Sequence, residues 1–411
     1  MKATTGAVGL WRRLRWTLSD LRALLLAGFD AMALSLLRRP QAAMPPAKPS
    51  VAVFILHGGG DAVLALPCLE EIRRRYPGER FQFVLYCQPG VAEFAGHFAP
   101  ADEIVEIDRH RIVRSLGYRL NALRDIVARR HAVALQPTFN RMLAVEDSLM
   151  RATAAPERLG SGGSPAFLGP IGRWLGDRWY HRLTSPSGRP MHELERYAEF
   201  VANLGWPAPP LRVPDFTLPP TTNALSPGYL LIVPDSSSPL KSWPMAKFEA
   251  LAGNLADRTD KMIVIAGRRS VEGFGQTLAP RERYHHIDMS GQTSIMQFLS
   301  LIRDACLVIT NDSGGLHFAV ALRRPVLAIA GGGLPERYHP YPAWARGTLA
   351  VVERRLPCYG CSWRCIYNVA PGSPAPCVGD IEVDDVLAAL SRPGMPSLQD
   401  VPAPALARSA G

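Results

Sequence analysis

Three loops of the sequence carry side chains and glycines that suit the handling of an anionic ligand. The sharpest is the run Thr310-Asn311-Asp312-Ser313-Gly314-Gly315-Leu316-His317, which stands between a predicted strand and a predicted apolar helix. Amides at a helix N-terminus carry positive partial charge, so Ser313 and Gly314 are candidates to grip a diphosphate. Asp312 repels phosphate and is expected to orient the loop or bind a hydroxyl. His317, one turn further on, either meets the ligand or caps the core.

The second loop runs from Pro234 to Pro244 and follows another predicted strand. It contains the hydroxyls of Ser236 and Ser237 and the ammonium group of Lys241, and a helix is expected to begin near Pro244. A hydroxyl-rich loop that ends in a lysine just before a helix is suited to holding phosphate oxygens. The alternative interpretation is a solvated turn.

The third loop is His57-Gly58-Gly59-Gly60-Asp61, after the first predicted strand. Three glycines allow a tight turn and close approach to a ligand, and Asp61 is then a candidate general base at the mouth of a cleft. The competing interpretation is a glycine turn in which Asp61 is the N-cap of a helix. The loop lacks the Lys-Ser/Thr of a Walker loop and the spacing of a dinucleotide-binding fingerprint.

The seven cysteines fall into two groups. Cys68, Cys87 and Cys306 stand singly in apolar surroundings and are predicted core residues. The other four lie within twenty residues, at Cys358, Cys361, Cys365 and Cys377. Four thiolates can close a tetrahedral Zn or Fe site, although this spacing matches no ordinary zinc finger. The alternatives are a structural metal and four reduced cysteines, with disulfides disfavoured in a reducing cytosol.

Strands and helices alternate along both halves of the chain and would position these loops. Short apolar runs predict strands, and runs with helical spacing predict helices. The predicted strands are 51–56, 81–86, 104–107, 131–135, 229–233, 262–266, 307–310 and 326–330, and the predicted helices include 65–76, 245–255, 295–305 and 318–322. Such alternation implies parallel sheets covered on both faces, with ligands bound beyond the carboxyl ends of the strands. All three loops occupy that position.

Length and composition predict a two-domain α/β protein. At ~150 residues per domain, 411 residues suggest two or three domains. The 47% hydrophobic and 20% charged residues exclude disorder, collagen or coiled coil for the whole chain. A proline-rich stretch at 206–227 separates two doubly wound domains, 50–215 and 225–395, the second with the cysteine-rich segment 358–377. An extension and linker, 1–49, would precede them and a flexible tail, 396–411, would follow.

Positive charge is concentrated in the first fifty residues. Eight basic residues against Asp20 and Asp30 give +6 of the net +10 there. The rest of the chain is nearly balanced, which argues against nucleic acid as a partner. Apolar residues recur at helical spacing from 11 to 37 and predict a basic amphipathic helix on an anionic membrane surface, with a packed helix and a signal peptide as alternatives. The uninterrupted apolar run is too short for a membrane span.

The three loops and several other motifs together resemble glycosyltransferase family 9, the bacterial heptosyltransferases. The resemblance covers about residues 50–390 and rests on the order and spacing of its motifs. These are Gly60-Asp61 with Pro67, the helix end 73–77, the helix start 191–197 with Leu204-Gly205, Lys241-Ser242-Trp243-Pro244, Ser290-Gly291-Gln292-Thr293-Ser294, and Asp312-Ser313-Gly314 with His317. The family commonly has Ser/Ala-Leu before Gly-Asp, where this chain has His57-Gly58-Gly59, and this departure leaves the acceptor open.

The resemblance implies a GT-B fold, with an acceptor-side domain first and a nucleotide-sugar-binding domain second. It implies inverting, metal-independent transfer of a heptose or related sugar from ADP-heptose or another nucleotide sugar to a lipopolysaccharide core. The enzyme would be cytoplasmic, peripheral on the inner face of the cytoplasmic membrane. Asp61 would be the general base, and Lys241, Ser313 and Gly314 would hold the diphosphate.

Related cysteine clusters occur in many family members, and autotransporter-modifying heptosyltransferases carry an iron-binding cysteine finger. The resemblance therefore leaves two alternatives to lipopolysaccharide. One is transfer to serines of a secreted adhesin, and the other is nucleotide-sugar binding without turnover.

Overall fold

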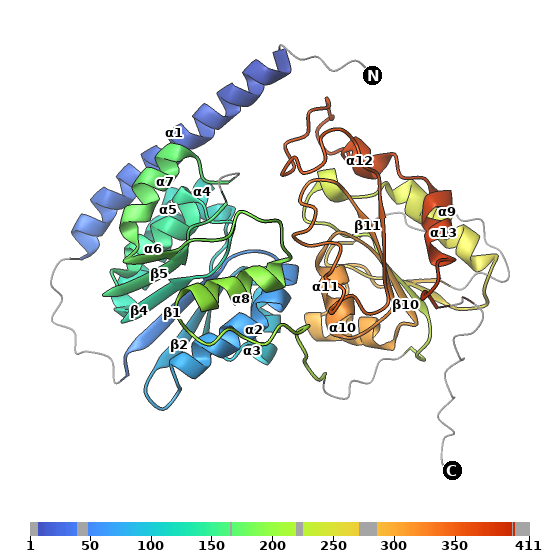
Figure 1. Cartoon of the computed structure of the whole chain (residues 1–411), viewed down its shortest axis with the longest axis horizontal. Helices are drawn as coiled ribbons and strands as arrows, with labels where there is room; N and C mark the ends of the chain where they lie inside the picture. Colours follow the sequence, from blue (N-terminus) through green and yellow to red (C-terminus); the bar gives the residue numbers. More distant parts are fainter. Residues whose placement is uncertain are drawn as a thin grey trace. The chain divides into compact units, whose positions relative to one another are not determined.

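The computed structural model describes residues 7–38, 48–164, 167–218, 225–270, 286–396 and 398, with side chains from residue 20 onward. The chain divides into two compact units, Met1–Leu211 and Arg212–Gly411 (Figure 1). Each unit contains one six-stranded sheet with helices, so the predicted α/β class with two parallel sheets is confirmed. The division falls inside the proline-rich stretch. The predicted linker, over 39–47, and nearly all of the predicted tail lie outside the described residues.

The sheet of unit 1 is parallel throughout, in the order β3-β2-β1-β4-β5-β6. Its strands are β1 (Ser50–Ile55), β2 (Gln82–Cys87), β3 (Glu103–Glu106), β4 (Val133–Gln136), β5 (Glu157–Ser161) and β6 (Arg182–Thr184). The central strand β1 is apolar and buried at every position. Its side chains alternate between the two faces of the sheet, so an uninterrupted apolar run is what a strand covered on both faces requires.

Helices cover both faces of this sheet (Figure 1). Ala52 and Phe54 of β1 pack in one core with residues of α1, α5 and α6, while Ile55 faces α2 and α3. The helical segments are α1 (Ala7–Leu37), α2 (Gly59–Arg75), α3 (Pro89–Phe98), α4 (Arg111–Arg114), α5 (Leu116–Arg129), the π-helix η1 (Leu143–Asp147), α6 (Ser148–Thr153), α7 (Pro170–Gly176), η2 (Asp177–Trp179) and α8 (Glu193–Asn203).

Unit 2 repeats the plan with the order β12-β11-β10-β7-β8-β9, again parallel throughout. Its strands are β7 (Leu230–Val233), β8 (Ile263–Ile265), β9 (His286–Asp288), β10 (Leu307–Asn311), β11 (Val326–Ala330) and β12 (Leu349–Glu353). Its helices are η3 (Pro239–Lys241), α9 (Met245–Ala256), α10 (Ile295–Asp304), α11 (Gly314–Ala321), α12 (Pro376–Gly379) and α13 (Val383–Leu390). In Figure 1, α9 and α13 cover one face of the sheet and α10 and α11 the other.

The first helix, α1, is part of unit 1 rather than a separate extension. It packs on α5, α6, α7 and η1 (Figure 1). The side chains of Leu26, Ala27, Ala33 and Leu34 are buried, and so is Asp30, which pairs with Arg119 of α5 at 2.5 Å. The packed-helix alternative therefore describes this face, because a buried ion pair and four apolar side chains hold it.

The opposite face of α1 remains exposed. Leu21, Leu25, Met32 and Leu36 are each more than half exposed, at 52%, 66%, 60% and 56%. At 3.6 residues per turn these four side chains fall within an arc of about 60°. We define them as the α1 stripe. Among the described residues, no helix combines the length and the apolar character needed to cross a membrane.

Candidate functional site

Three neighbouring strands of unit 2 bring their following loops together. β10 pairs with β7 on one side and with β11 on the other, so their carboxyl ends share one edge. Asn311, the last residue of β10, fixes the loop after β7. Its side-chain oxygen accepts from the backbone N–H of Trp243 at 3.0 Å, and its amide nitrogen donates to the carbonyl of Pro234 at 2.6 Å. Both ends of the loop that carries Lys241 are thereby tied to β10.

Lys241 and Asp312 meet between these loops. The Lys241 ammonium, on a side chain 17% exposed, donates to Asp312 Oδ2 at 3.5 Å, and the Asp312 side chain is only 3% exposed. Burial opposes ionisation of Asp312, but the charge of Lys241 and the electrostatic effect of the nearby imidazoles of His339 and His317 outweigh it and hold its pKa below the usual range. Asp312 is therefore an anion that keeps cationic groups at this edge of the sheet.

Ser313 and Gly314 form the N-terminus of α11. Ser313 is the N-cap, with an extended backbone, but its side chain makes no capping hydrogen bond and lies 3.3 Å from the hydroxyl of Thr310. The helix packs tightly on the sheet, since a Cβ at Gly315 would lie 2.8 Å from the Thr310 hydroxyl. A helix N-terminus whose amides receive no side-chain cap from Ser313 favours an anionic ligand.

The other residues predicted for this loop cluster take different positions. His317 is buried, with Nδ1 2.7 Å from the hydroxyl of Tyr341, so it belongs to the core. Ser236 is buried and donates to the carbonyl of Ser238 at 3.3 Å, which shapes the loop. Ser237 is exposed at the tip of the same loop.

Three residues near Lys241 carry no signal in the sequence motifs. His339 Nε2 lies 3.9 Å from Asp312 Oδ2, and the rings of Tyr338 and Trp363 face the Lys241 ammonium at 5.7 and 5.1 Å. Tyr338 and His339 lie between β11 and β12, and Trp363 lies after β12; a glycine triplet, 331–333, directly follows β11. That triplet was the signal available in the sequence, because glycine-rich loops also follow the strands β1 and β10.

In unit 1, Asp61 lies in the first turn of α2 rather than at its N-cap. Gly58 is the N-cap, in an extended conformation, and α2 begins at Gly59. The alternative in which Asp61 caps the helix is therefore wrong. A Cβ at Gly58 would meet no atom within 4 Å, so this glycine is not required by packing. Asp61 is partly exposed, as a group that exchanges a proton with a ligand must be.

Glu146 and Arg109 are charged neighbours of the same loop that the sequence analysis missed. Glu146 is fully buried and accepts from Arg109 Nε at 2.9 Å. Burial opposes its ionisation, but the charges of Arg109 and His57 hold the pKa of Glu146 below its usual range. Glu146 belongs to η1, and π-helical turns are frequent at functional sites. The sequence signal that could have identified this site is the adjacent pair Glu146-Asp147, which stands inside an apolar run.

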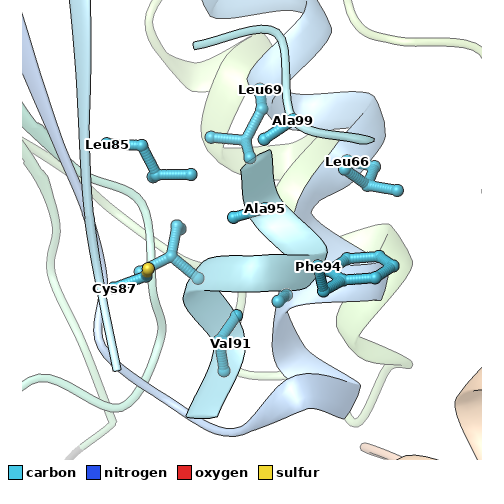
Figure 2. Close-up of a pocket in the computed structure, with 10 residues that line it drawn as sticks. Leu66, Leu69, Leu85, Cys87, Val91, Phe94, Ala95 and Ala99 are labelled. Atoms are coloured by element: carbon cyan, nitrogen blue, oxygen red, sulfur yellow. The ribbon is translucent and has the colours of Figure 1, made fainter. Parts of the chain in front are cut away.

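A small cavity lies on the α2–α3 side of β1 and β2 in unit 1, and Figure 2 shows its lining. Its volume is about 10 Å³, and all ten lining residues are apolar, including Leu66, Cys87 and Phe94. A cavity of this size accommodates about one water molecule at most. It is a packing gap in the core, and Cys87 is one of the predicted core cysteines.

The four clustered cysteines are free thiols. Cys361 accepts from the N–H groups of Trp363 and Arg364, and Cys377 accepts from that of Gly332. Burial raises the pKa of both thiols. Over the described residues, no three or more His, Cys, Asp or Glu side chains are placed to hold a metal ion. A structural metal at these four cysteines stays a prediction from the sequence.

Comparison with known proteins agrees with this architecture. Residues 149–363, just over half of the chain, match the family model "Glycosyltransferase family 9 (heptosyltransferase)". Lipopolysaccharide heptosyltransferase 2 of Escherichia coli (strain K12) is 30% identical over 111 residues, which are 26% of this chain and 32% of that protein. This chain thus matches about a third of that relative's length. Lipopolysaccharide heptosyltransferase 1 of Salmonella typhimurium is 23% identical over 66% of this chain and 85% of its own.

Solved structures show the same fold. The structure of E. coli ADP-heptose LPS heptosyltransferase II matches with a TM-score of 0.59 and 17% identity, over 83% of this chain and 97% of that one. A family 9 glycosyltransferase from Veillonella parvula matches with a TM-score of 0.59 and 18% identity, over 85% of this chain and 98% of that one. The GT-B arrangement of two Rossmann-like domains is therefore the fold of this protein. From the family match, the chain belongs to glycosyltransferase family 9, the heptosyltransferase family.

Proposed function

We propose that the protein is an inverting glycosyltransferase that moves a heptose, or a related sugar, from ADP-heptose or another nucleotide sugar to a lipopolysaccharide core. The observation that carries this proposal is the Lys241–Asp312 pair beside the N-terminus of α11. An ammonium group and helix amides at the carboxyl ends of parallel strands suit a diphosphate.

In the proposed reaction, an acceptor hydroxyl attacks the anomeric carbon of the donor sugar. Asp61 takes the hydroxyl proton as the new C–O bond forms, and the bond between the anomeric carbon and the diphosphate oxygen breaks. Lys241 and the amides near Ser313 stabilise the negative charge that develops on the departing nucleoside diphosphate. Because this positive charge comes from the chain itself, we expect turnover to persist in a chelator.

The same loops suggest roles for the remaining residues. We assign Asp312, with Ser236 and Ser237, to orienting Lys241 and the loop around the donor, and His317 to supporting Asp312 from the core. We assign His57 and the following glycines to the acceptor side, where the open space at Gly58 leaves room for a bulky substrate. His57-Gly58-Gly59 departs from the Ser/Ala-Leu that the family commonly has here. We therefore expect this protein to differ from other family members in its acceptor specificity.

The test is transfer from purified nucleotide sugars, with ADP-heptose compared against UDP- and GDP-linked sugars. The proposal expects ADP release that depends on a heptose-accepting lipopolysaccharide core. Release that depends on a serine-rich adhesin fragment instead would indicate the protein O-heptosyltransferase alternative. Tight ADP-heptose binding with no release by either acceptor would indicate a sugar-nucleotide-binding protein. No binding of any nucleotide sugar would reject the donor assignment.

We also propose that the α1 stripe attaches the protein to the inner face of the cytoplasmic membrane. The four exposed side chains Leu21, Leu25, Met32 and Leu36 form one apolar face, and Arg12, Arg13 and Arg15 precede them in the same helix. A basic helix with one apolar face suits an anionic lipid surface, where each basic residue contributes ~1 kcal/mol.

Vesicle flotation tests this attachment. Replacement of the four stripe residues by serine should abolish flotation with vesicles that contain phosphatidylglycerol. Leu116→Ser removes a similarly exposed leucine, 53% exposed on α5, and should float like the natural protein. If the stripe variant still floats, attachment lies outside the stripe.

A further inference from the structure

The cysteine-rich segment reaches the loops that we assign to the donor. The backbone N–H groups of Gly360 and Ser362 donate to the carbonyls of Gly332 and Gly333, both at 2.7 Å. On the other side, the N–H of Ala375 donates to the carbonyl of Leu240, the residue before Lys241, at 3.1 Å. The segment is therefore tied both to the loop after β11 and to the loop after β7.

Trp363 occupies the centre of this contact. A Cβ at Gly331 would lie 2.6 Å from the indole ring, and a Cβ at Gly333 would overlap the ring. Glycine at both positions therefore lets the ring lie directly on the backbone after β11. From there the ring faces the Lys241 ammonium at 5.1 Å, within the range of a cation–π interaction.

The backbone that carries this ring is strained. Ser362 and Trp363 have φ values of 54° and 61°, in the left-handed region that side chains with a Cβ seldom adopt. The Cys361 thiol stabilises the turn by accepting from the N–H groups of Trp363 and Arg364. Strain of this kind tends to persist at ligand clamps and active sites. It is here localised on the residue that touches Lys241.

We propose that Trp363 is a positioning residue of the donor site, which holds the Lys241 ammonium in place for the diphosphate. This inference rests on the proposed function. Asp312 attracts the ammonium from one side, and the faces of Trp363 and Tyr338 confine it from others. A lysine confined in this way has already lost much of its side-chain freedom, so less is lost when the donor binds.

The surroundings of Trp363 favour a ligand rich in acceptors. The indole Nε1 is buried and has no hydrogen-bond partner among the described residues, and an indole N–H can only donate. The neighbouring ammonium also only donates. The buried indole N–H lies against the backbone at Gly333, so the Lys241 ammonium, paired with the Asp312 carboxylate, is the donor that suits a diphosphate.

The test is a double-mutant cycle on ADP affinity, measured by calorimetry on the full chain. Trp363→Ala and Lys241→Ala should each weaken ADP binding by about five- to thirtyfold, the range expected for losing a desolvated cation–π contact or a phosphate contact. In the Lys241→Ala background, Trp363→Ala should have little further effect, because the residue acts through Lys241. Trp363→Phe keeps a ring and should stay within about threefold of the natural protein.

Two further variants keep the result interpretable. Trp344→Ala removes an exposed tryptophan of the same unit, 43% exposed, and should leave ADP affinity unchanged. If Trp363→Ala fails to fold, Cys361→Ala tests the same turn, since it removes the acceptor that Cys361→Ser retains. Weaker ADP binding by Cys361→Ala than by Cys361→Ser supports the proposal, and equal binding by both opposes it.

The outcomes separate this inference from the proposed function. If the natural protein binds ADP and Lys241→Ala weakens it, but Trp363→Ala does not, Trp363 has no positioning role and the donor assignment stands. If the Trp363 and Lys241 effects simply add, Trp363 does not act through Lys241, and the inference is overturned. If the natural protein binds neither ADP nor a nucleotide sugar, the proposed function fails and this inference fails with it.

Discussion

Asp30→Ala should destabilise unit 1 severely, although the residue lies in the first helix. Asp30 accepts from Arg119 Nε at 2.6 Å and Nη2 at 2.5 Å, and also from the Ser148 hydroxyl, and both charged side chains are fully buried. In the variant, the buried guanidinium keeps only neutral partners, the carbonyls of Ile112 and Ala144 and the Ser148 hydroxyl. Breaking a buried ion pair in this way costs about 3–5 kcal/mol.

That loss is a large part of the ~5–15 kcal/mol that stabilises a typical domain. Because the two units can unfold separately, the assay should report unit 1 alone. Hydrogen exchange at the amides of β1 and α5 in increasing urea meets this need. Replacing both Asp30 and Arg119 by leucine should recover much of the loss, because no unpaired charge then remains buried.

Leu25→Ala provides the matched control on the same helix, since Leu25 is 66% exposed on the opposite face. A surface change of this kind is usually within ±0.5 kcal/mol. If the amides of β1 and α5 are as well protected from hydrogen exchange in Asp30→Ala as in Leu25→Ala, α1 is not integral to unit 1. The packing argument is then refuted. The same result would revive the interpretation of residues 1–49 as a detachable extension.

Three other predictions follow from named groups. Asp61→Asn should abolish sugar transfer while ADP affinity stays within a few fold, because the amide keeps the shape and cannot take the proton; comparable turnover would reject Asp61 as the base. Lys241→Ala should raise the donor KM strongly, because it removes the charge that faces the diphosphate and leaves Asp312 without its cation; an unchanged KM would leave the loop as only a turn. Burial, with nearby Arg129, lowers the pKa of His131 to about 4 in the fold, against ~6.5 in an unfolded chain. The unfolded chain therefore binds the extra proton between these values, and unit 1 should lose on the order of 3 kcal/mol as pH falls from 6.5 to 4. His131→Gln should flatten that part of the urea-unfolding profile, and an unchanged slope would exclude His131 as its source.

The central strands could be predicted because they are buried on both faces. The predicted 326–330 is β11 to the residue, and 51–56 differs from β1 by one position at each end. Strands without an apolar run were missed: β5, between β4 and β6, contains Glu157 and Arg158, and the edge strand β12 alternates between buried and partly exposed positions. The start of α2 was placed six residues late, because its glycines and Pro67 weaken the helical pattern.

The candidate site was predictable only in part. Lys241 and Asp312 each follow a recognisable strand, but their meeting depends on β7 and β10 being neighbours, and strand order leaves no mark on a single sequence. His339 comes from the irregular segment after β11 and Trp363 from the one after β12, and in neither segment does a periodic pattern show where the side chain lies. Nothing in the spacing of the cysteines indicates a link to the donor loops, yet Trp363 of the same segment faces the Lys241 ammonium at 5.1 Å.

The charge distribution of unit 1 gives α1 two separable roles on opposite faces. The pairs Asp30–Arg119 and Glu146–Arg109 are each neutral, so they hold the fold without changing the net charge of unit 1, and the positive excess of the first fifty residues comes from other side chains. That excess accompanies the exposed α1 stripe, whereas Asp30 lies on the face packed against α5. Stability and the proposed surface attachment are therefore assigned to different side chains of the same helix. Leu25→Ser should weaken vesicle binding at nearly unchanged stability, and combined replacement of Asp30 and Arg119 by leucine should restore the fold and leave vesicle binding unchanged.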